Sequence, residues 1–276
     1  MRVAAIQMVS TPQVERNLEA ARRLLSEAAS AGARLAALPE YFCLMGLRDR
    51  DKLAVAEEPG HGPIQDALAR LARELRLWIV AGTLPLRVPG RDDRVHNSCL
   101  VFAPDGSRVA RYDKIHLFAF DNGRERYDEG VLLEAGRETA SVVVSDGAER
   151  HRVGLSVCYD LRFPELYRAL CAPEAPLPCD LICVPSAFTH TTGQAHWELL
   201  LRARAVENQC YVMAPAQGGR HENGRRTWGH SLVVDPWGEV LACLDEGEGV
   251  VVADVDARRL AEVRGQLPAL AHRRLR

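Results

Sequence analysis

The chain has 276 residues, of which 47% are hydrophobic and 26% are charged, and its formal net charge is −2. This length and composition are typical of a globular protein with a substantial core, organised as one large domain or two small ones. The near-neutral charge gives no footprint for nucleic acid, and no run approaches the ~18 apolar residues of a membrane span, so neither partner is expected.

Strand and helix patterns alternate through the first half of the chain. The residues Arg2–Met8 are mostly apolar and predict a buried strand, and the apolar positions from Val14 to Ala28 fall at helical spacing. A turn at Pro104-Asp105-Gly106 indicates a hairpin. The further elements predicted here are a strand over 35–38, a helix over 64–75, and strands over 78–83, 98–103 and 108–113, followed by an irregular stretch at 119–137.

The second half continues in the same way. Pro164 suits the first position of a helix, which we predict to run to Leu170. A second hairpin is indicated at Pro236-Trp237-Gly238. The other predicted elements are strands over 141–144, 152–157, 180–185, 211–216, 231–235, 239–244 and 250–255 and a helix over 194–209.

This interleaving favours a mixed α/β sandwich over separate all-α and all-β domains. No Ser/Gly-rich linker, composition break or repeat marks a boundary, so we expect one domain over residues 1–276. The basic end of the sequence, AHRRLR, belongs to a segment over 256–276 that we expect to be a C-terminal tail contacting a partner subunit.

The cysteines and the N-terminus indicate the compartment. Eight cysteines are scattered without a C-x-x-C pair, and the start MRVAAIQMVS lacks the long apolar stretch of a signal peptide. We therefore expect reduced thiols in a cytoplasmic protein. Cys179 and Cys183 are spaced like metal ligands, but no second pair follows, so no metal and no cofactor is expected.

Cys158 lies in the segment GLSVCYDLRFPEL, where an alternating apolar strand meets a turn and a helix. A side chain at such a turn is exposed at the edge of a sheet, and the nearby helix N–H groups favour an anion. By composition alone Cys158 is one cysteine among eight, and a core residue or a metal ligand remains open. Ser156 superficially fits a G-x-S-x-G motif, but the final glycine is missing, and the residue lies inside the strand.

Two other charged residues follow predicted strands. Glu40 follows a buried strand in AALPEYF, and Lys114 follows a strand in ARYDKIHLF. Taken singly, each could be an ordinary solvated side chain. A nucleophilic cysteine, however, needs a base for its proton and a cation or donor for the developing oxyanion.

The ordered segments LPEYF, YDKIHLF and SVCYDLRFPEL resemble the three signatures of the nitrilase superfamily of carbon–nitrogen hydrolases, and the likeness covers nearly the whole chain. The resemblance implies a four-layer α-β-β-α sandwich that forms a homodimer or a higher homo-oligomer. It also implies that Cys158 is the nucleophile, Glu40 the general base and Lys114 the electrostatic partner of the tetrahedral intermediate, with the backbone N–H of Tyr159 as a further oxyanion donor.

A second glutamate follows the lysine in the superfamily. In the stretch GRERYDEG the matching residue is Glu129, with Glu125 as the alternative, and the surrounding loop departs from the usual pattern. Segments that border the substrate pocket in relatives contain Arg162, Phe188 and Thr192. An arginine there suits a substrate carboxylate, although a structural ion pair is an equal alternative.

Within the superfamily, AQGGRHENGRRTWGHS and DPWGE resemble the Nit branch. The implied function is a thiol amidohydrolase that releases ammonia from a small carboxylate-bearing amide, with deaminated glutathione as the expected substrate and Arg220 and His221 as further candidate contacts. An omega-amidase acting on 2-oxoglutaramate remains open because such enzymes share TTGxAHWELL, and so does a catalytically silent binding protein. His116 and His196 are interpreted as structural hydrogen-bonding residues.

Overall fold

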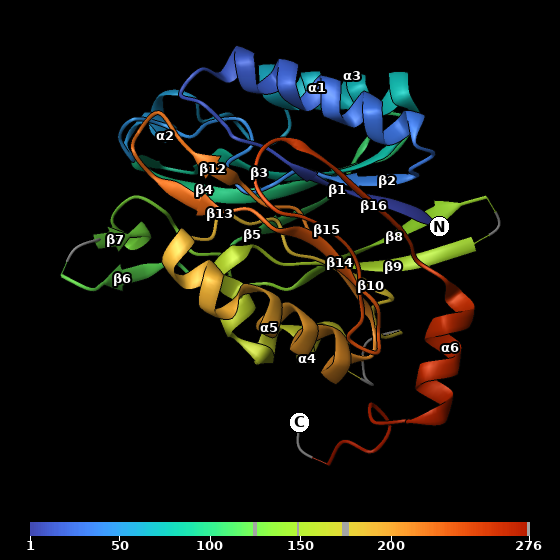
Figure 1. Ribbon diagram of the computed structural model, residues 1–276. Helices are drawn as coiled ribbons and strands as arrows, with labels where there is room; N and C mark the ends of the chain where they lie inside the picture. Colours follow the sequence, from blue (N-terminus) through green and yellow to red (C-terminus); the bar gives the residue numbers. More distant parts are fainter. Residues whose placement is uncertain (124–125, 148, 173–176, 275–276) are drawn as a thin grey trace.

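The computed structural model describes residues 1–123, 126–147, 149–172 and 177–274. Two six-stranded sheets lie face to face, with helices α1 and α3 over one and helices α4 and α5 over the other (Figure 1). The expected four-layer α-β-β-α sandwich is confirmed. No helix in the described ranges is both long enough and apolar enough to cross a bilayer.

The first sheet has the strand order β16-β1-β2-β3-β4-β5. Strands β1, β2 and β3 are parallel, whereas β16, β4 and β5 run antiparallel to their neighbours. The bounds are β1 Arg2–Gln7, β2 Leu35–Ala37, β3 Trp78–Val88, β4 Arg91–Phe102, β5 Arg108–Asp113 and β16 Gly249–Asp254, with α1 Val14–Ser30 and α3 Pro63–Leu75 outside.

The second sheet has the strand order β15-β14-β11-β10-β9-β8, in which β9, β10 and β11 are parallel. Its helix α4 begins at Pro164 and ends at Leu170, as predicted. The other bounds are β8 Ala140–Asp146, β9 Glu149–Leu155, β10 Leu181–Cys183, β11 Tyr211–Ala214, β14 Ser231–Val234, β15 Val240–Leu244 and α5 His190–Asn208.

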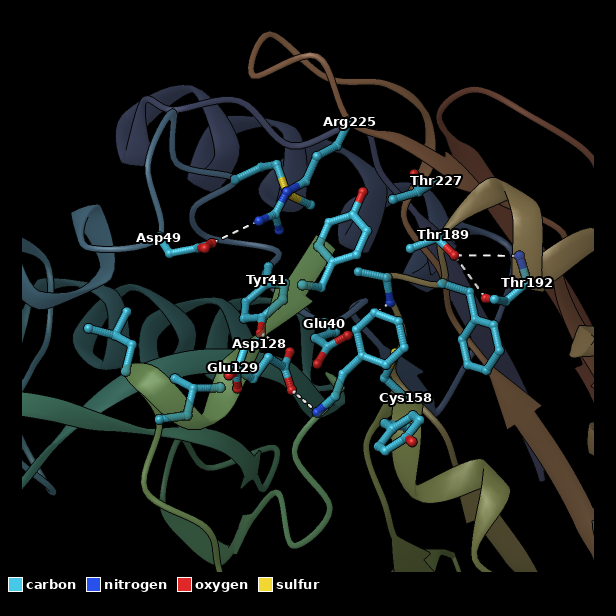
Figure 2. Close-up of a pocket in the computed structure, with 18 of the residues that line it drawn as sticks. Glu40, Tyr41, Asp49, Asp128, Glu129, Cys158, Thr189, Thr192, Arg225 and Thr227 are labelled. Atoms are coloured by element: carbon cyan, nitrogen blue, oxygen red, sulfur yellow. Dashed lines mark hydrogen bonds and ion pairs between the residues drawn. The ribbon is translucent and has the colours of Figure 1, made fainter. Parts of the chain in front are cut away.

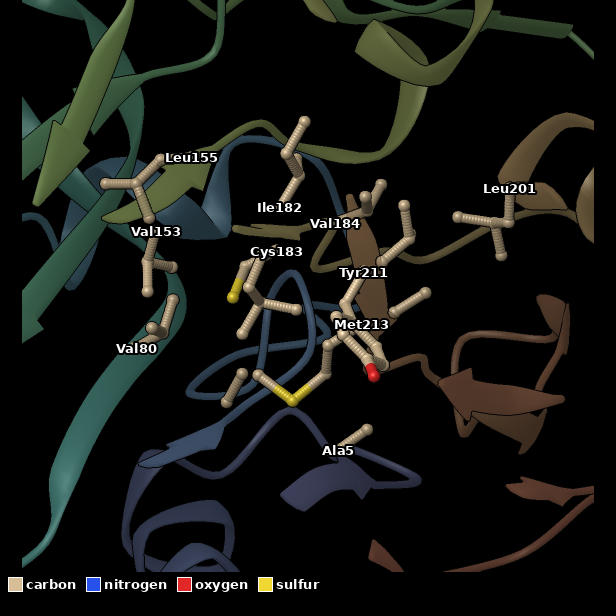
Figure 3. Close-up of a cluster of buried hydrophobic side chains, with 14 of the residues drawn as sticks. Ala5, Val80, Val153, Leu155, Ile182, Cys183, Val184, Leu201, Tyr211 and Met213 are labelled. Atoms are coloured by element: carbon tan, nitrogen blue, oxygen red, sulfur yellow. The ribbon is translucent and has the colours of Figure 1, made fainter. Parts of the chain in front are cut away.

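The core follows from the alternation of side chains along each strand. In β1, Val3 and Ala5 face the second sheet, while Ala4 and Ile6 pack beneath α1 and α3. A strand buried on both faces reads as a continuous apolar run, which is the pattern of the sequence here. The layer between the sheets continues through the side chains shown in Figure 3, among them Val80, Val153, Leu155, Cys183 and Met213.

Several short elements were not anticipated. The stretch 119–137, expected to be irregular, contains a small hairpin and a single 3-10 turn, and the first half of the expected tail is helical. In these segments the pattern of apolar and polar residues is too short, or the residues are too polar, to predict a strand or a helix. The bounds are β6 Ala119–Asp121, β7 Arg126–Asp128, η1 Glu129–Val131, α2 Asp51–Ala54, β12 Gly218–Arg220, β13 Arg226–Trp228 and α6 Ala257–Gln266.

Strand ends bring the chemically interesting residues to one edge of the sandwich. Glu40 follows β2, Lys114 follows β5, and Cys158 opens the 3-10 turn η2 (Cys158–Arg162) after β9. Gly82 in β3 permits the close approach of the chain before Glu40, since a Cβ there would lie 1.9 Å from the Pro39 carbonyl oxygen.

Candidate active site

A pocket opens at this edge of the sandwich (Figure 2). Its lining combines the loop after β2, the region of β7 and η1, the turn η2, the start of α5 and the hairpin β12–β13. The lining residues include Glu40, Tyr41, Lys52, Glu129, Cys158, Tyr159, Arg162, Phe188, Thr192, Arg225 and Arg226.

Cys158 is held at the pocket by the turn that ends β9. Its φ is +49°, in the left-handed region that few residues other than glycine adopt, and its N–H donates to the Pro185 carbonyl at 2.9 Å. Strain of this kind persists only where the surroundings fix the chain, and it concentrates at functional sites. The turn leaves the Cys158 side chain 8% exposed.

Glu40 is almost fully buried next to this thiol. Its Oε1 accepts hydrogen bonds from Asn97 Nδ2 and Lys114 Nζ, both at 2.9 Å, and its Oε2 accepts from the Ala187 N–H at 3.0 Å. Burial raises the pKa of Glu40, and the positive charge of Lys114 opposes that shift only in part. A carboxyl group with this balance readily gains and loses a proton.

Lys114 lies between two carboxylates. Its Nζ is 2.9 Å from Glu40 Oε1 and 2.8 Å from Glu129 Oε2. Burial disfavours the ammonium, but Glu129 and Glu40 outweigh that effect and raise the pKa of Lys114 well above its ordinary value. The ammonium is therefore a fixed positive charge beside the thiol.

Glu129 is held in place by hydrogen bonds from three different residues. Its carboxylate accepts hydrogen bonds from Lys114, from the Phe118 N–H at 2.7 Å and from the Tyr41 hydroxyl at 2.6 Å. Burial favours its neutral form, yet Lys114 and the other donors hold the pKa of Glu129 below its ordinary value. The alternative residue Glu125 lies outside the described residues.

Burial also raises the pKa of Cys158 well above that of a free thiol, and the charge of Glu40, to which the thiol hydrogen-bonds, adds to the shift. Lys114 only partly opposes this. The resting thiol is therefore protonated and becomes a thiolate only by passing its proton to a neighbour. Glu40 is the hydrogen-bonded acceptor.

Asp160, in the same turn as Cys158, was not singled out from the sequence. Its Oδ2 accepts from the Val157 N–H at 2.8 Å and from the Tyr112 hydroxyl at 2.7 Å. Its Oδ1 accepts from the N–H of His116 at 3.0 Å and faces His116 Nδ1 at 2.7 Å. One fully buried carboxylate thus joins the cysteine turn to the loop that follows Lys114.

The expected substrate contacts Tyr159, Arg162, Phe188 and Thr192 all line the pocket. The Arg162 guanidinium lies 5.4 Å from the centre of the Phe188 ring and 5.9 Å from that of Tyr159, and its Nη1 is 3.2 Å from Nδ1 of His196. None of these described partners is acidic.

Two further candidate contacts are corrected by the structure. Arg220 points to solvent, and His221 is buried against the Ser10 carbonyl and the Thr227 hydroxyl, so neither lines the pocket. The loop of the β12–β13 hairpin and the start of β13 present Arg225 and Arg226 to the pocket instead. The hairpin was not predicted, so the residues at its tip could not be identified from the sequence.

The remaining candidates have structural contacts. Ser156 is buried, with its hydroxyl 3.0 Å from the Tyr167 hydroxyl and from the Cys183 carbonyl, and His116 stacks on Phe163. Within the described ranges, no three His, Cys, Asp or Glu side chains gather in a way that would hold a metal ion.

Known proteins resemble this chain along nearly its whole length. Residues 2–265 match the family described as carbon-nitrogen hydrolase. The chain is 41% identical over 271 residues to deaminated glutathione amidase of Synechocystis sp., covering 98% of this chain and 97% of the relative. It is 37% identical to Omega-amidase NIT2 of Xenopus tropicalis, covering 99% and 95%. The crystal structure of the C. elegans NitFhit protein superimposes with a TM-score of 0.88 at 37% identity over 99% of this chain, which spans 65% of that protein.

Proposed function

This chain belongs to the carbon-nitrogen hydrolase family, and from that membership we propose that it is a thiol amidase acting on a small amide with carboxylate groups, first of all deaminated glutathione. The observation that carries the proposal is the buried arrangement in which Lys114 Nζ lies 2.9 Å from Glu40 and 2.8 Å from Glu129, beside the Cys158 thiol. A ~40% identical relative of nearly equal length is named for this activity.

Acylation begins with the proton of the Cys158 thiol. Glu40 takes that proton, and Sγ forms a bond to the carbonyl carbon of the amide. The charge that develops on the carbonyl oxygen is stabilised by the Lys114 ammonium and by the backbone N–H of Tyr159. When the C–N bond breaks, Glu40 returns the proton to the departing nitrogen, which leaves as an amine, and the acyl group remains on Cys158 as a thioester.

Deacylation uses the same groups with water. Glu40 takes a proton from the attacking water, the C–S bond breaks, and the proton passes to the sulfur. The acid product leaves and the free thiol is restored. The net reaction adds one water across one amide bond and consumes no other co-reactant.

The contrast between the two glutamates supports this division of roles. The pKa of Glu40 is raised by burial, whereas the pKa of Glu129 is lowered by Lys114 and its other donors. Two carboxylates with oppositely shifted pKa values fit different tasks. Glu40 is placed to exchange protons, and Glu129 remains ionised to keep Lys114 charged and in position.

The leaving group depends on the substrate. In deaminated glutathione the scissile amide nitrogen belongs to a cysteine residue, so hydrolysis yields 2-oxoglutarate and cysteinylglycine. Ammonia is released from 2-oxoglutaramate, whose amide is primary. The sequence-based expectation of ammonia release therefore applies to the omega-amidase reaction and not to deaminated glutathione.

Arg162 is proposed to hold the carboxylate of the 2-oxoacid end. It follows the nucleophile in the same turn, and its described partners are aromatic rings and a histidine instead of an acid. A guanidinium in this setting suits bidentate pairing with a carboxylate. Phe188, whose ring lies against the Arg162 guanidinium, and Thr192 also line the pocket and complete the proposed contact set.

The test is a substrate panel with the purified protein and product identification by mass spectrometry. We expect 2-oxoglutarate and cysteinylglycine from deaminated glutathione, with a higher kcat/KM than for 2-oxoglutaramate and no turnover of simple nitriles. A preference for 2-oxoglutaramate would favour the omega-amidase function, for which the similarity to the Xenopus protein is the specific observation. No hydrolysis of any amide would contradict the proposal.

We also propose that the chain acts as one cytoplasmic domain that forms a homodimer or a higher homo-oligomer. Helix α5 buries Trp197 and Leu201 on one side, yet it leaves Leu199 68% exposed and Val206 49% exposed. Trp237, 55% exposed, follows β14 close to α5, where Arg202 donates to the Gly238 carbonyl. A partly apolar outer helix face of this kind suits a subunit contact.

The segment 256–276 is proposed to extend that contact. Its helix α6 packs on its own chain through Leu260 and Val263, and Arg264 donates to the carbonyls of Gln209 and Cys179. The residues after α6 would then reach the partner subunit. Sedimentation velocity of the full chain tests the oligomer, and a monomer at micromolar concentration would contradict it.

A further inference from the structure

We infer that the pocket has a second anion subsite, formed by Lys52 and Arg225, which receives the carboxylate on the amine side of the scissile bond. The inference rests on the proposed function and makes it more specific. The preferred substrate is then an amide with one carboxylate on the acyl part and another on the leaving amine.

Lys52 is a nearly buried cation in the pocket wall. Its side chain is only 12% exposed, and its Nζ lies 4.7 Å from the centre of the Tyr41 ring. The carboxylate paired with it in the described ranges is Asp49, at 3.5 Å, and Asp49 is itself 60% exposed. Burial lowers the pKa of Lys52, so its charged form is short of stabilising partners.

Arg225 shares that single carboxylate. Its Nη2 is 2.8 Å from Asp49 Oδ1, and its guanidinium lies 5.2 Å from the centre of the Tyr127 ring. Among the described residues, Lys52 and Arg225 therefore pair with one mostly exposed acid, and these three side chains together carry a net positive charge. An incoming carboxylate would neutralise that charge in a partly desolvated site, where charge-assisted hydrogen bonds are strong.

The position of this group indicates which carboxylate it receives. Figure 2 shows Arg225 and Asp49 on one side of the pocket and Cys158 on the other, with Tyr41 and Glu40 between them. Arg162, by contrast, belongs to the turn of Cys158 itself, where the acyl group stays attached.

The leaving amine departs on the side of the group that protonates it, which the mechanism assigns to Glu40. Tyr41 follows Glu40 in the chain, and Lys52 covers the Tyr41 ring. The amine portion is thus directed toward Lys52 and Arg225. The acyl portion is directed toward Arg162, and the two cationic groups serve opposite ends of one substrate.

The experiment is a cycle that changes the enzyme and the substrate separately. The substrates are deaminated glutathione, the same compound with its glycine carboxylate converted to an amide, and 2-oxoglutaramate. The variants are Lys52→Met and Arg225→Gln. Arg220→Gln, on the same hairpin but exposed and outside the pocket, is the matched control.

For the wild-type enzyme, masking the glycine carboxylate should lower kcat/KM by about tenfold or more, mainly through KM. Lys52→Met and Arg225→Gln should each lower kcat/KM for deaminated glutathione about tenfold more than for the masked compound or for 2-oxoglutaramate. Arg220→Gln should behave as wild type with all three. This non-additive pattern supports the subsite.

The outcomes separate the two proposals. If the enzyme hydrolyses deaminated glutathione and the masked compound equally well, the subsite is contradicted while the proposed function remains. The same holds if the variants lose equal factors on all three substrates. If no substrate is hydrolysed, the proposed function is wrong and the subsite inference falls with it. The comparison of deaminated glutathione with the masked compound uses the wild-type enzyme, so it tests the subsite even if a variant fails to fold.

A sign test uses Asp49→Asn. Removing the shared carboxylate leaves both cations without their acid, so KM for deaminated glutathione should fall by about two- to fivefold, while KM for the masked compound should change less. A rise in KM for deaminated glutathione alone would mean that Asp49 organises the site by a different route, and it would overturn the charge argument.

Discussion

The two ends of the pocket are built in different ways. At the inner end, Glu40 and Lys114 are almost fully buried, and each charged atom has partners at 2.8–3.0 Å supplied from strand ends or from adjoining turns. At the outer end, Lys52 and Arg225 come from the short helix α2 and from the β12–β13 hairpin, and their charges are only partly compensated.

The difference reflects two physical demands. Reacting groups must be held in fixed positions with defined protonation states, which requires burial and complete pairing. Groups that bind a charged substrate must retain unsatisfied interactions until it arrives. The paired charges at the inner end would therefore carry out the chemistry, and the partly unpaired charges at the outer end would select the substrate.

The largest effect is expected at the inner end from Cys158→Ala. The side chain is small and in contact with the apolar core, so the fold should survive, but no thioester can form. We expect kcat to fall by about four powers of ten or more. Retention of more than a tenth of the wild-type rate in a properly folded variant would exclude Cys158 as the nucleophile.

Glu40→Gln should cost about a thousandfold in kcat and should also change the pH profile. Because burial raises the pKa of Glu40, kcat/KM of the wild type should rise with pH in a range above that of an ordinary glutamate. This acid limb reports the loss of the Glu40 proton, so it should disappear in Glu40→Gln. An unchanged acid limb in the variant would assign the base to another group.

Asp160→Asn tests whether catalysis at the inner end depends on the hydrogen bonds by which Asp160 fixes the turn of Cys158. An amide cannot accept all the hydrogen bonds from Val157, His116 and Tyr112, so we expect kcat to fall about 10- to 100-fold with a smaller change in KM.

The control is Asp235→Asn. Asp235 is equally buried but serves the β14–β15 turn, accepting from the Trp237 and Glu239 N–H groups. Both variants should lose about 1–3 kcal/mol of stability. Only Asp160→Asn should lose kcat well below its unfolding temperature. Equal kcat in the two variants would reduce Asp160 to a purely structural residue.

The smallest effect is expected for Cys243→Ser. Cys243 is the exposed cysteine on strand β15 and lies outside the pocket, whereas Cys158 lines it. Activity should stay within about twofold of wild type. Iodoacetamide should then inactivate the Cys243→Ser protein in proportion to labelling of Cys158, as read by peptide mass spectrometry. Complete labelling of Cys158 with full activity would contradict its catalytic role.

The buried, apolar strands of the two sheets and helix α4 could be predicted from the sequence because their signals are local. The helix from Pro164 and the strands β1, β2 and β10 follow from apolar spacing and from the constraints of proline. The hairpins β6–β7 and β12–β13 could not be predicted, because pairing of two three-residue strands depends on the surface to which they are attached.

The site shows the same division. Glu40, Lys114 and Cys158 were identifiable because each is a reactive residue at the end of an apolar strand within a recognisable segment. Asp160 and Tyr41 lie in two of those segments, yet only their contacts with Val157, His116 and Glu129 indicate what they do. No sequence pattern marks Arg225 as a pocket residue, and the sequence instead indicates Arg220 and His221 as substrate contacts.

The sequence by itself determined the order of the main strands and helices, the family and the residues with the capacity for acyl transfer, because periodicity and motifs are properties of neighbouring residues. Only the tertiary structure decided which charges are paired. Glu40 lies far from Lys114 and Glu129 in the chain, and the opposite pKa shifts of the two glutamates arise because folding buries both of them with one oxygen of each within 3 Å of Lys114 Nζ. The incomplete pairing of Lys52 and Arg225 likewise depends on folding, which brings a helix and a hairpin from opposite halves of the chain to one carboxylate.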